Sequence, residues 1–239
     1  MHLSFMNTLE RKLGVANENW LMSAREKLCL IGLLELLRPQ KSLEFGFHRG
    51  GATAWLAKFS ETVITVDVNE HVNDAPKNFP NVTSWNCPTE EAVERIKKEM
   101  LSFDVAIIDA DHSRKAVARD LEGILPHAET ILLHDSSNPD CRKGMLDILD
   151  KQDSHAYSLD LISSSIKHDG LWGGLGIAVR AEKSGLMKEF KGEFSPYNYL
   201  SVHHSMLFGR KFSNLFSKLM VPLQQLKSKV RIKIGGLKS

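Results

Sequence analysis

Short apolar runs that return at regular intervals restrict the fold of this chain more than any other feature of the sequence. Seven runs follow a longer apolar segment, and helical or turn sequence separates them: 42–45, 63–66, 82–85, 105–108, 131–133, 156–162 and 175–179. Runs of this length are typical of strands that are buried on both faces of a parallel sheet, with helices as the connections. The spacing therefore predicts an α/β protein.

The segments between the runs predict the helices of such a fold. Residues 22–37 are too densely apolar for a surface stripe, so we expect a mostly buried helix. It should end before Pro39, because the residue that precedes a proline disfavours the helical conformation. Further helices are predicted over 52–59, 89–100, 114–125 and 139–151.

The last connection predicts a reversed strand. The segment between the last two runs, 163–174, is only about a dozen residues long and contains three glycines. A parallel crossover needs a helix of its own, whereas a loop of this size suits an antiparallel return. The usual nicotinamide-binding sheet and the eightfold barrel do not fit this pattern. We expect a Rossmann-like sheet of seven strands, mostly parallel with an antiparallel last strand, and helices on both faces.

Composition narrows the class of protein. With 42% hydrophobic and 25% charged residues, the chain is an ordinary globular protein, not a disordered or fibrous one. The longest apolar run, 28–34, falls short of the roughly 20 residues that a membrane span needs. No secretory signal is visible, so we expect a cytoplasmic protein. Cys29, Cys87 and Cys141 lack paired spacing, so we expect reduced thiols.

Charge divides the chain into two predicted parts. No Asp or Glu follows Glu193, whereas eight Lys and Arg residues do, which leaves −6 for the first 193 residues from a total of +2. We predict an acidic main domain over 1–193, with an N-terminal helical segment, and a basic extension over 194–239 that contains an amphipathic helix. We expect that helix to dock on its own domain or on a second subunit of a homo-oligomer, or to make a peripheral contact with an anionic membrane. Nucleic acid is not an expected partner.

A glycine-rich turn follows the first run, in LEFGFHRGGATAWLA (43–57). Gly46, Gly50 and Gly51 lie between a predicted strand and a predicted helix, where backbone N–H groups approach a ligand at the helix N-terminus. The Gly-Lys-Ser/Thr of a P-loop is missing, and His48 occupies the second glycine position of the dinucleotide pattern. Tight packing of helix on strand is the alternative explanation of these glycines.

Two acidic residues accompany this turn. Asp67 ends the second run, about 20 residues beyond the glycines, where a carboxylate accepts hydrogen bonds from the ribose hydroxyls of an adenosine cofactor. A solvated Asp at a strand end is the alternative. Glu44 lies inside the first run and needs a partner if it is buried, such as a positively charged group of a ligand.

The glycine turn and Asp67, taken with FDVAIIDADH (103–112) and ILLHDSS (131–137), resemble the class I S-adenosylmethionine-dependent methyltransferases. More narrowly, they resemble the small-molecule O-methyltransferases grouped with macrolide-sugar methyltransferases and cephalosporin-hydroxylase-like proteins, over residues 42–179. The resemblance implies the seven-stranded methyltransferase sheet and S-adenosyl-L-methionine as the cofactor. It implies as cofactor-binding residues Asp67 at the ribose, Asn86 and Cys87 near adenine, Glu44, Gly46, Gly50 and Thr53 along the methionine part, and Asp109 as a further contact.

Acidic and histidine side chains follow the fourth and fifth runs. Asp109 ends the fourth run, with His112 just beyond it, and His134 and Asp135 end the fifth. The carboxyl ends of parallel strands open into one crevice, so we expect these groups to converge. Carboxylates suit Mg²⁺, and the resemblance implies a metal held by Asp109 and an acidic pair after the fifth strand. His134 in place of one acid shifts the preference toward Mn²⁺ or Zn²⁺, so the predicted divalent-metal ligands are Asp109, His134 and Asp135.

His112 is the candidate general base, since imidazole titrates near neutral pH and a hydroxyl that accepts a methyl group must lose its proton. The resemblance implies a catalytic histidine here, three residues after Asp109, which we also place at the reaction centre. A solvated loop histidine is the alternative. Asp111 either caps the following helix or orients His112.

The sequence thus predicts an S-adenosylmethionine-dependent O-methyltransferase that acts on a hydroxyl of a small polar acceptor, such as a sugar, a glycan or a natural product. Two other functions remain open at this point. One is a non-catalytic cofactor-binding or assembly protein on the same fold, and the other is a hydroxylase-associated homologue.

Overall fold

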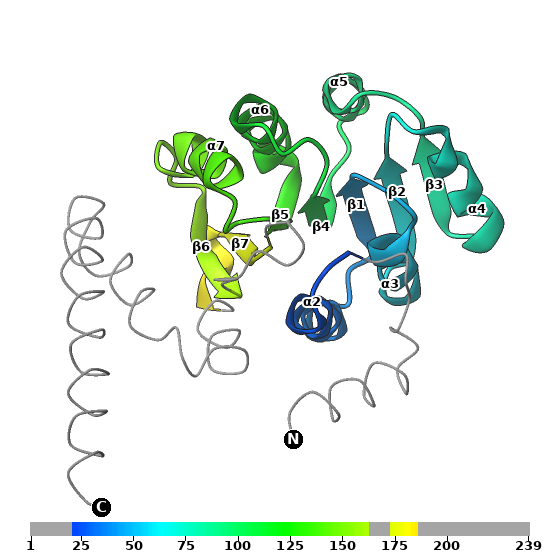
Figure 1. Cartoon of the computed structure of the whole chain (residues 1–239), viewed down its shortest axis with the longest axis horizontal. Helices are drawn as coiled ribbons and strands as arrows, with labels where there is room; N and C mark the ends of the chain where they lie inside the picture. The colour runs from blue at the N-terminus through cyan, green and yellow to red at the C-terminus, as the bar shows by residue number, and fades with distance from the viewer. Residues whose placement is uncertain (1–20, 163–172, 186–239) are drawn as a thin grey trace, which may run out of the picture. The chain divides into compact units, whose positions relative to one another are not determined.

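The computed structural model describes residues 21–162 and 173–185. Within these ranges seven strands form one sheet, in the order β3-β2-β1-β4-β5-β7-β6 (Figure 1). The strands are β1 (Lys41–Phe45), β2 (Thr62–Val66), β3 (Val82–Trp85), β4 (Phe103–Ile108), β5 (Ala128–His134), β6 (His155–Ile162) and β7 (Leu175–Arg180). Each predicted apolar run is a strand, so the prediction of a seven-stranded α/β sheet is confirmed.

Helices fill the connections between the strands. The five predicted helices are confirmed, and their ends differ from the prediction by two residues at most. The helices are α2 (Ala24–Leu37), α3 (Gly51–Phe59), α4 (Ala75–Asn78), α5 (Thr89–Glu99), α6 (Arg114–Ile124) and α7 (Pro139–Leu149), with the short 3-10 turns η1 (Glu70–Asp74), η2 (Leu125–His127) and η3 (Ala181–Lys183). The sequence analysis did not predict η1 and α4, which are too short to show a periodic pattern.

Strand direction follows the prediction, with one addition. The pairs β1–β2, β1–β4, β2–β3 and β4–β5 are parallel, whereas β7 is antiparallel to both of its neighbours, β5 and β6. The antiparallel last strand is therefore confirmed. Because β7 inserts between β5 and β6, its register pairs Leu175 with His134 and brings Gly174 to the carboxyl end of β5.

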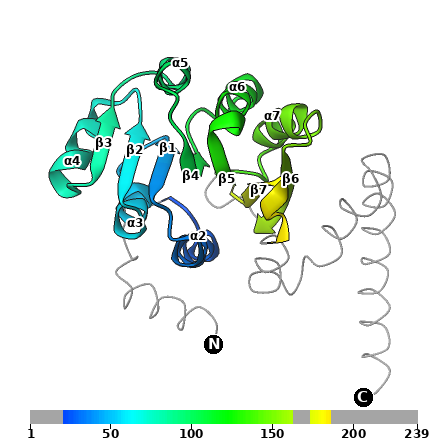
Figure 2. The ribbon, with the colours of Figure 1, turned by 180° about the vertical axis from the view of Figure 1, so that it is seen from behind.

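The sheet is covered on both faces, as predicted. Helices α5, α6 and α7 lie on one face, and α2 and α3 lie on the other (Figures 1 and 2). Successive side chains of a strand point to opposite faces. In β4, Val105 and Ile107 accordingly join the core beneath α2 and α3, whereas Ala106 and Ile108 join the core beneath α6 and α7. Both cores are apolar, which explains the near-continuous hydrophobic runs.

Helix α2 begins at a capping box. The Ser23 hydroxyl accepts a hydrogen bond from the Glu26 N–H, and the Glu26 carboxylate accepts one from the Ser23 N–H at 2.6 Å. The helix ends at Arg38, whose φ of 44° is left-handed, directly before Pro39. Leu30, Leu33 and Leu34 are fully buried, which confirms the mostly buried helix.

Several predictions concern residues outside the described ranges. The amphipathic helix of the extension, the boundary between 193 and 194 and most of the loop 163–174 are among them, and they stay predictions, as do the oligomer and membrane contacts. In 21–162 and 173–185, none of the helices has both the length and the apolar character that crossing a bilayer requires. Cys29, Cys87 and Cys141 are free thiols, as expected.

Candidate active site

A cavity of about 530 Å³ opens at the carboxyl ends of the central parallel strands. Its volume lies in the range of small-molecule sites, and its position is the one where α/β sheets bind ligands. Most of the predicted site residues line it: Glu44, Gly46, Asp67, Cys87, Asp109, His112, His134 and Asp135. Three predicted cofactor residues are not among those that line it: Gly50, Thr53 and Asn86.

The glycine turn is shaped by two positive φ angles. Gly46 follows β1 with a φ of 96°, and a Cβ at this position would overlap the backbone carbonyl of Asp109. Gly50 has a φ of 80° and caps the N-terminus of α3, where a Cβ would press against the Phe47 ring. Only glycine fits both places without strain. Gly46 therefore lets the ends of β1 and β4 approach each other closely.

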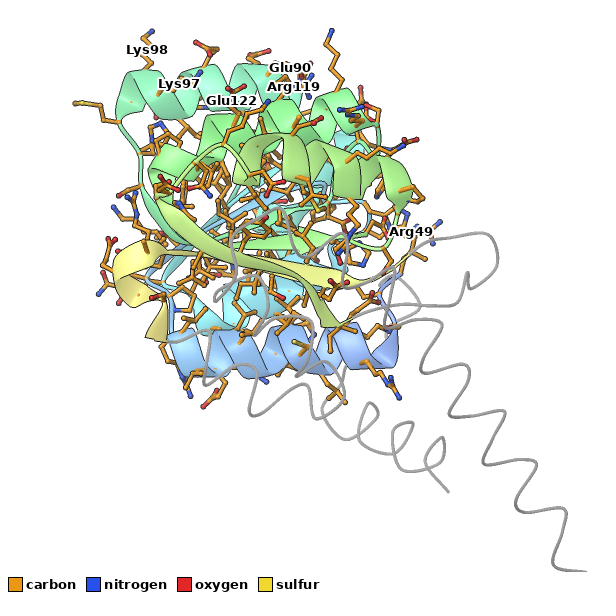
Figure 3. All side chains as sticks on the ribbon, turned by 90° about the vertical axis from the view of Figure 1, so that its left-hand side faces the viewer. Arg49, Glu90, Lys97, Lys98, Arg119 and Glu122 are labelled. Carbon is orange, nitrogen blue, oxygen red and sulfur yellow. The ribbon has the colours of Figure 1, made fainter. Side chains whose placement is uncertain are left out.

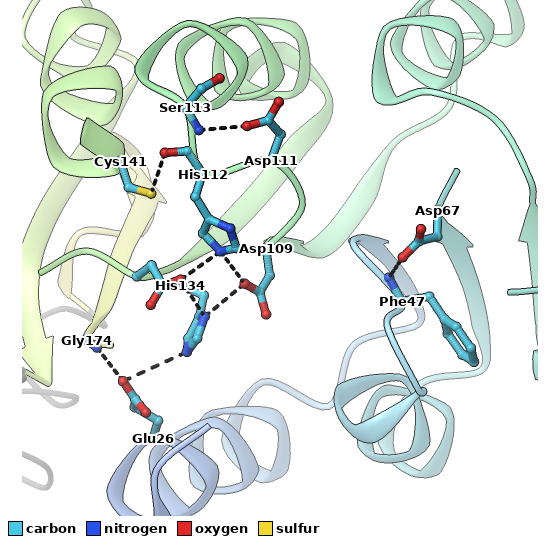
Figure 4. Close-up of polar contacts among 11 residues, drawn as sticks. Glu26, Phe47, Asp67, Asp109, Asp111, His112, Ser113, His134, Cys141 and Gly174 are labelled. Atoms are coloured by element: carbon cyan, nitrogen blue, oxygen red, sulfur yellow. Dashed lines mark hydrogen bonds and ion pairs between the residues drawn. The ribbon is translucent and has the colours of Figure 1, made fainter. Parts of the chain in front are cut away.

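Asp67 holds this turn in place. One oxygen, Oδ2, accepts hydrogen bonds from the backbone N–H groups of Phe47 at 2.8 Å (Figure 4) and of His48 at 3.0 Å. The other, Oδ1, accepts one from the Asn69 N–H at 2.8 Å. The side-chain amide of Asn86 donates a hydrogen bond to the backbone carbonyl of Asp67 at 2.9 Å, which supports the same strand end. A carboxylate has about four lone-pair sites, so Asp67 keeps acceptor capacity for a ligand.

Glu44 has its partners inside the protein. It is 1% exposed, and its Oε2 accepts hydrogen bonds from the hydroxyls of Thr65, at 2.7 Å, and Thr53. Burial raises the pKa of Glu44 to about 8, and the two hydroxyls offset only part of that effect. Thr53 is thus a buried support of Glu44 rather than a cavity residue, and the buried carboxyl does not depend on a ligand for its hydrogen bonds.

The side chains of Asp109, His112, His134 and Asp135, which we call the acid–histidine cluster, meet at the other end of the cavity (Figure 4). His112 Nε2 lies 2.7 Å from Asp135 Oδ2 and 3.6 Å from Asp109 Oδ1. His134 Nδ1 lies 2.9 Å from Asp109 Oδ1. The structure therefore brings together the groups that follow β4 and β5, as the sequence predicted.

Mutual charge governs the protonation of this cluster. Hydrogen bonds to Asp109 and Asp135 raise the pKa of His112 to about 10. Burial opposes the charging of His134, but Asp109, Asp135 and Glu26 outweigh it and raise the pKa of His134 to about 9. Burial also opposes the charging of Asp109, yet the two histidines hold the pKa of that carboxyl below its usual range. In this arrangement His112 is a positively charged imidazolium at neutral pH. Another cation at the carboxylates would favour the release of its extra proton.

Neighbouring residues fix the backbone around His112. Asp111 Oδ1 accepts a hydrogen bond from the Ser113 N–H at 2.7 Å, and Ser113 in turn caps α6 through the Ala116 N–H. The side chain of Asp111 therefore shapes the turn that leads into the helix, and the residue that caps the helix is Ser113 rather than Asp111. Cys141 in α7 donates its thiol proton to the His112 carbonyl at 3.4 Å (Figure 4).

The donor set fits a divalent cation. One ligand atom each from Asp109, His134 and Asp135 can be chosen so that all lie within 4.8 Å of one another. Among the described residues, Asp135 Oδ1 is a buried side-chain oxygen without a hydrogen-bond partner, and such an atom is unfavourable unless something binds it. Two carboxylates and one imidazole suit Mn²⁺ or Zn²⁺, with Mg²⁺ as the harder alternative.

Two residues of the site were not predicted from the sequence. Glu26 in α2 lies 3.9 Å from His134 Nε2, and Arg119 in α6 lines the cavity and pairs with Glu90 in α5 (Figures 3 and 4). The Ser-x-x-Glu pattern at 23–26 signals only a helix cap. Arg119 lies in an ordinary amphipathic helix. Neither pattern could reveal a contact made across the tertiary structure.

Comparisons with known proteins match the part of the chain that runs from β1 to the end of β5. Residues 43–136 match a family model described as a methyltransferase domain. The chain is similar to the O-methyltransferase from Bacillus cereus in complex with SAH, with 18% identity, a TM-score of 0.55, and coverage of 74% of this chain and 90% of that one. None of the curated protein sequences matches the chain.

Two further solved structures are similar to this chain. One is the O-methyltransferase TomG from Streptomyces achromogenes, involved in tomaymycin synthesis, in complex with SAM (14% identity, TM-score 0.54, 74% of this chain and 88% of that one). The other is a putative caffeoyl-CoA O-methyltransferase from Staphylococcus aureus (16% identity, TM-score 0.53, 73% and 91%). At these identities the likeness shows the fold.

Glu44→Gln should change how the stability of the protein depends on pH. The pKa of Glu44 is raised from 4.5 to about 8, so between these values the folded state binds a proton that the unfolded state releases. The wild-type protein should therefore lose stability relative to Glu44→Gln as the pH rises from 5 to 8, on the order of 1 kcal/mol per pH unit. Chemical denaturation across this range measures the difference. Glu61→Gln, at an exposed position, should parallel the wild type, and a parallel curve for Glu44→Gln would refute the raised pKa.

Proposed function

We propose that the chain is an S-adenosylmethionine-dependent methyltransferase that methylates a hydroxyl of a small polar acceptor with the help of a divalent cation. Residues 43–136 match a methyltransferase-domain model, and the fold is similar to that of a solved O-methyltransferase. The acceptor class that we propose is a sugar, a glycan or a natural product. One observation carries the proposal: the glycine turn with Asp67 and the acid–histidine cluster line the same cavity. Binding groups for a cofactor and groups for proton transfer thus face one space.

The end of the cavity formed by the glycine turn and Asp67 offers a residue for each part of S-adenosyl-L-methionine. S-adenosyl-L-methionine supplies an electrophilic methyl group on a sulfonium when it is bound. Asp67, already ordered by the glycine turn, would hold the ribose, and Cys87 with Asn86 lies after β3 on the adenine side. Glu44 and Gly46, which line the cavity, would lie along the methionine part. Gly50 and Thr53 act indirectly, since they shape the turn and support Glu44.

The acid–histidine cluster would serve the acceptor. Asp109, His134 and Asp135 would hold the cation, which stabilises negative charge on the acceptor oxygen. With the cation at the carboxylates, His112 would release the proton that it shares with them and could then accept the hydroxyl proton at Nε2, the nitrogen that faces Asp135 and Asp109. In-line methyl transfer requires alignment above all, and carboxylates fixed at two neighbouring strand ends provide a rigid frame for it.

Asp67→Ala should weaken cofactor binding. The substitution removes the acceptor for the ribose and also the three backbone hydrogen bonds that order the turn. Since a hydrogen bond to a charged group contributes about 1.5–3 kcal/mol, we expect the dissociation constant of S-adenosylmethionine to rise at least about tenfold. Isothermal titration calorimetry gives this constant. Asp74→Ala, an exposed Asp that pairs with Lys77, is the control, and equal affinity of the two variants would contradict the role of Asp67.

His112→Ala should abolish turnover and preserve cofactor affinity. Loss of a general base lowers the rate by about 10²- to 10⁴-fold. The readout is formation of S-adenosylhomocysteine, by mass spectrometry, with a panel of sugars and vicinal diols as acceptors. His71→Ala, at an exposed histidine of η1, should match the wild type. An active His112→Ala enzyme would exclude His112 as the base.

A further inference from the structure

One buried ring nitrogen of His134 has no hydrogen-bond partner in the part of the chain that the structure describes. The residue is 8% exposed, and its Nδ1 faces Asp109 Oδ1 at 2.9 Å and Asp135 Oδ2 at 3.8 Å. Among the described residues, Nε2 has no partner within hydrogen-bond distance, although Glu26 Oε1 lies 3.9 Å away (Figure 4). A buried N–H without an acceptor is unfavourable, so the geometry calls for one at this place.

Glu26 is itself held firmly. It is 2% exposed, its Oε2 accepts a hydrogen bond from the Ser23 N–H at 2.6 Å, and its Oε1 accepts one from the Gly174 N–H. The carboxylate is therefore fixed at once by the start of α2 and by the segment that enters β7. Each carboxylate oxygen has two lone pairs, so Oε1 can accept a second hydrogen bond.

The two sides of the His134 ring face different partners. Nδ1 points to the carboxylates that complete the proposed cation site, and Nε2 points to Glu26. A histidine that binds a metal through one nitrogen usually donates the N–H of the other to a carboxylate, which fixes the tautomer and the orientation of the ring. A shift of roughly 1 Å would bring Nε2 and Oε1 to hydrogen-bond distance.

We propose that Glu26 is a positioning residue for the cation site. Its carboxylate accepts a hydrogen bond from the Nε2–H of His134, so that the lone pair of Nδ1 is directed at the space between Asp109 and Asp135. This inference rests on the proposed function, because it presupposes the divalent cation. It also gives α2 a part in the site, since the Ser23–Glu26 capping box places the carboxylate.

A purely structural role of Glu26 makes a different prediction. As an anchor of Gly174 alone, Glu26 would contribute to stability, and its loss would leave the cation affinity unchanged. Glu26→Gln separates the two roles, since the amide keeps one acceptor oxygen for the Gly174 N–H but loses the charge and one oxygen. Glu35→Gln is the matched control, because Glu35 lies on the exposed side of the same helix.

In the test, the full chain is first freed of metal with a chelator and then titrated with Co²⁺. Calorimetry gives the affinity, and the visible absorption of Co²⁺ reports the nitrogen ligand. We expect the affinity of Glu26→Gln to fall about 10- to 100-fold with an altered spectrum, whereas Glu35→Gln matches the wild type. In a His134→Ala background, Glu26→Gln should have no further effect on affinity, because Glu26 acts through His134.

The outcomes are distinguishable. Co²⁺ binding by the wild type with equal affinity and spectrum for Glu26→Gln would overturn this inference alone. An undiminished effect of Glu26→Gln in the His134→Ala background would overturn it as well. No Co²⁺ binding by the wild type would contradict the proposed cation and, with it, the role of Glu26. Thermal unfolding of each variant establishes that the protein is folded in the titration.

Discussion

The close approach of Gly46 to the backbone of Asp109 is the contact on which the site depends. With a φ of 96° and no side chain, Gly46 lets the turn after β1 pack directly on the end of β4. The turn held by Asp67 and the acid–histidine cluster therefore share one cavity rather than occupying separate places on the sheet. Any side chain at this position would push the two halves of the site apart.

Several ionisable groups of the site are buried. Glu26, Glu44, His134 and Asp135 are each at most 8% exposed, and burial of charge is costly unless partners compensate. Hydrogen bonds from hydroxyls offset the cost of burying Glu44, and hydrogen bonds from backbone N–H groups offset the cost of burying Glu26. The histidines and carboxylates of the cluster compensate one another only in part, since Asp135 Oδ1 and His134 Nε2 remain without partners among the described residues. Such incompletely paired groups are typical of functional sites, where stability is not the property being optimised.

Much of the fold and of the site could be predicted because the signals are local. Seven apolar runs gave the strands, the short glycine-containing loop gave the reversed β7, and strand ends placed Asp67, Asp109 and Asp135 at one edge. The rest depends on tertiary contacts that no local pattern encodes. Insertion of β7 beside β5 brings Gly174 to Glu26, 148 positions apart in the sequence, and the hydroxyl of Thr53 turns inward to Glu44 instead of lining the cavity. These contacts decide which polar residues support the site and which face a ligand.

The most direct test of this account is a crystal structure of the protein with S-adenosylhomocysteine and Mn²⁺, with the metal located by its anomalous scattering. We expect the ribose hydroxyls to lie on the Asp67 carboxylate, the sulfur to point toward Asp109 and His112, and the anomalous peak to lie among Asp109, His134 and Asp135. A cofactor bound outside this cavity, or a sulfur directed away from the acid–histidine cluster, would contradict it.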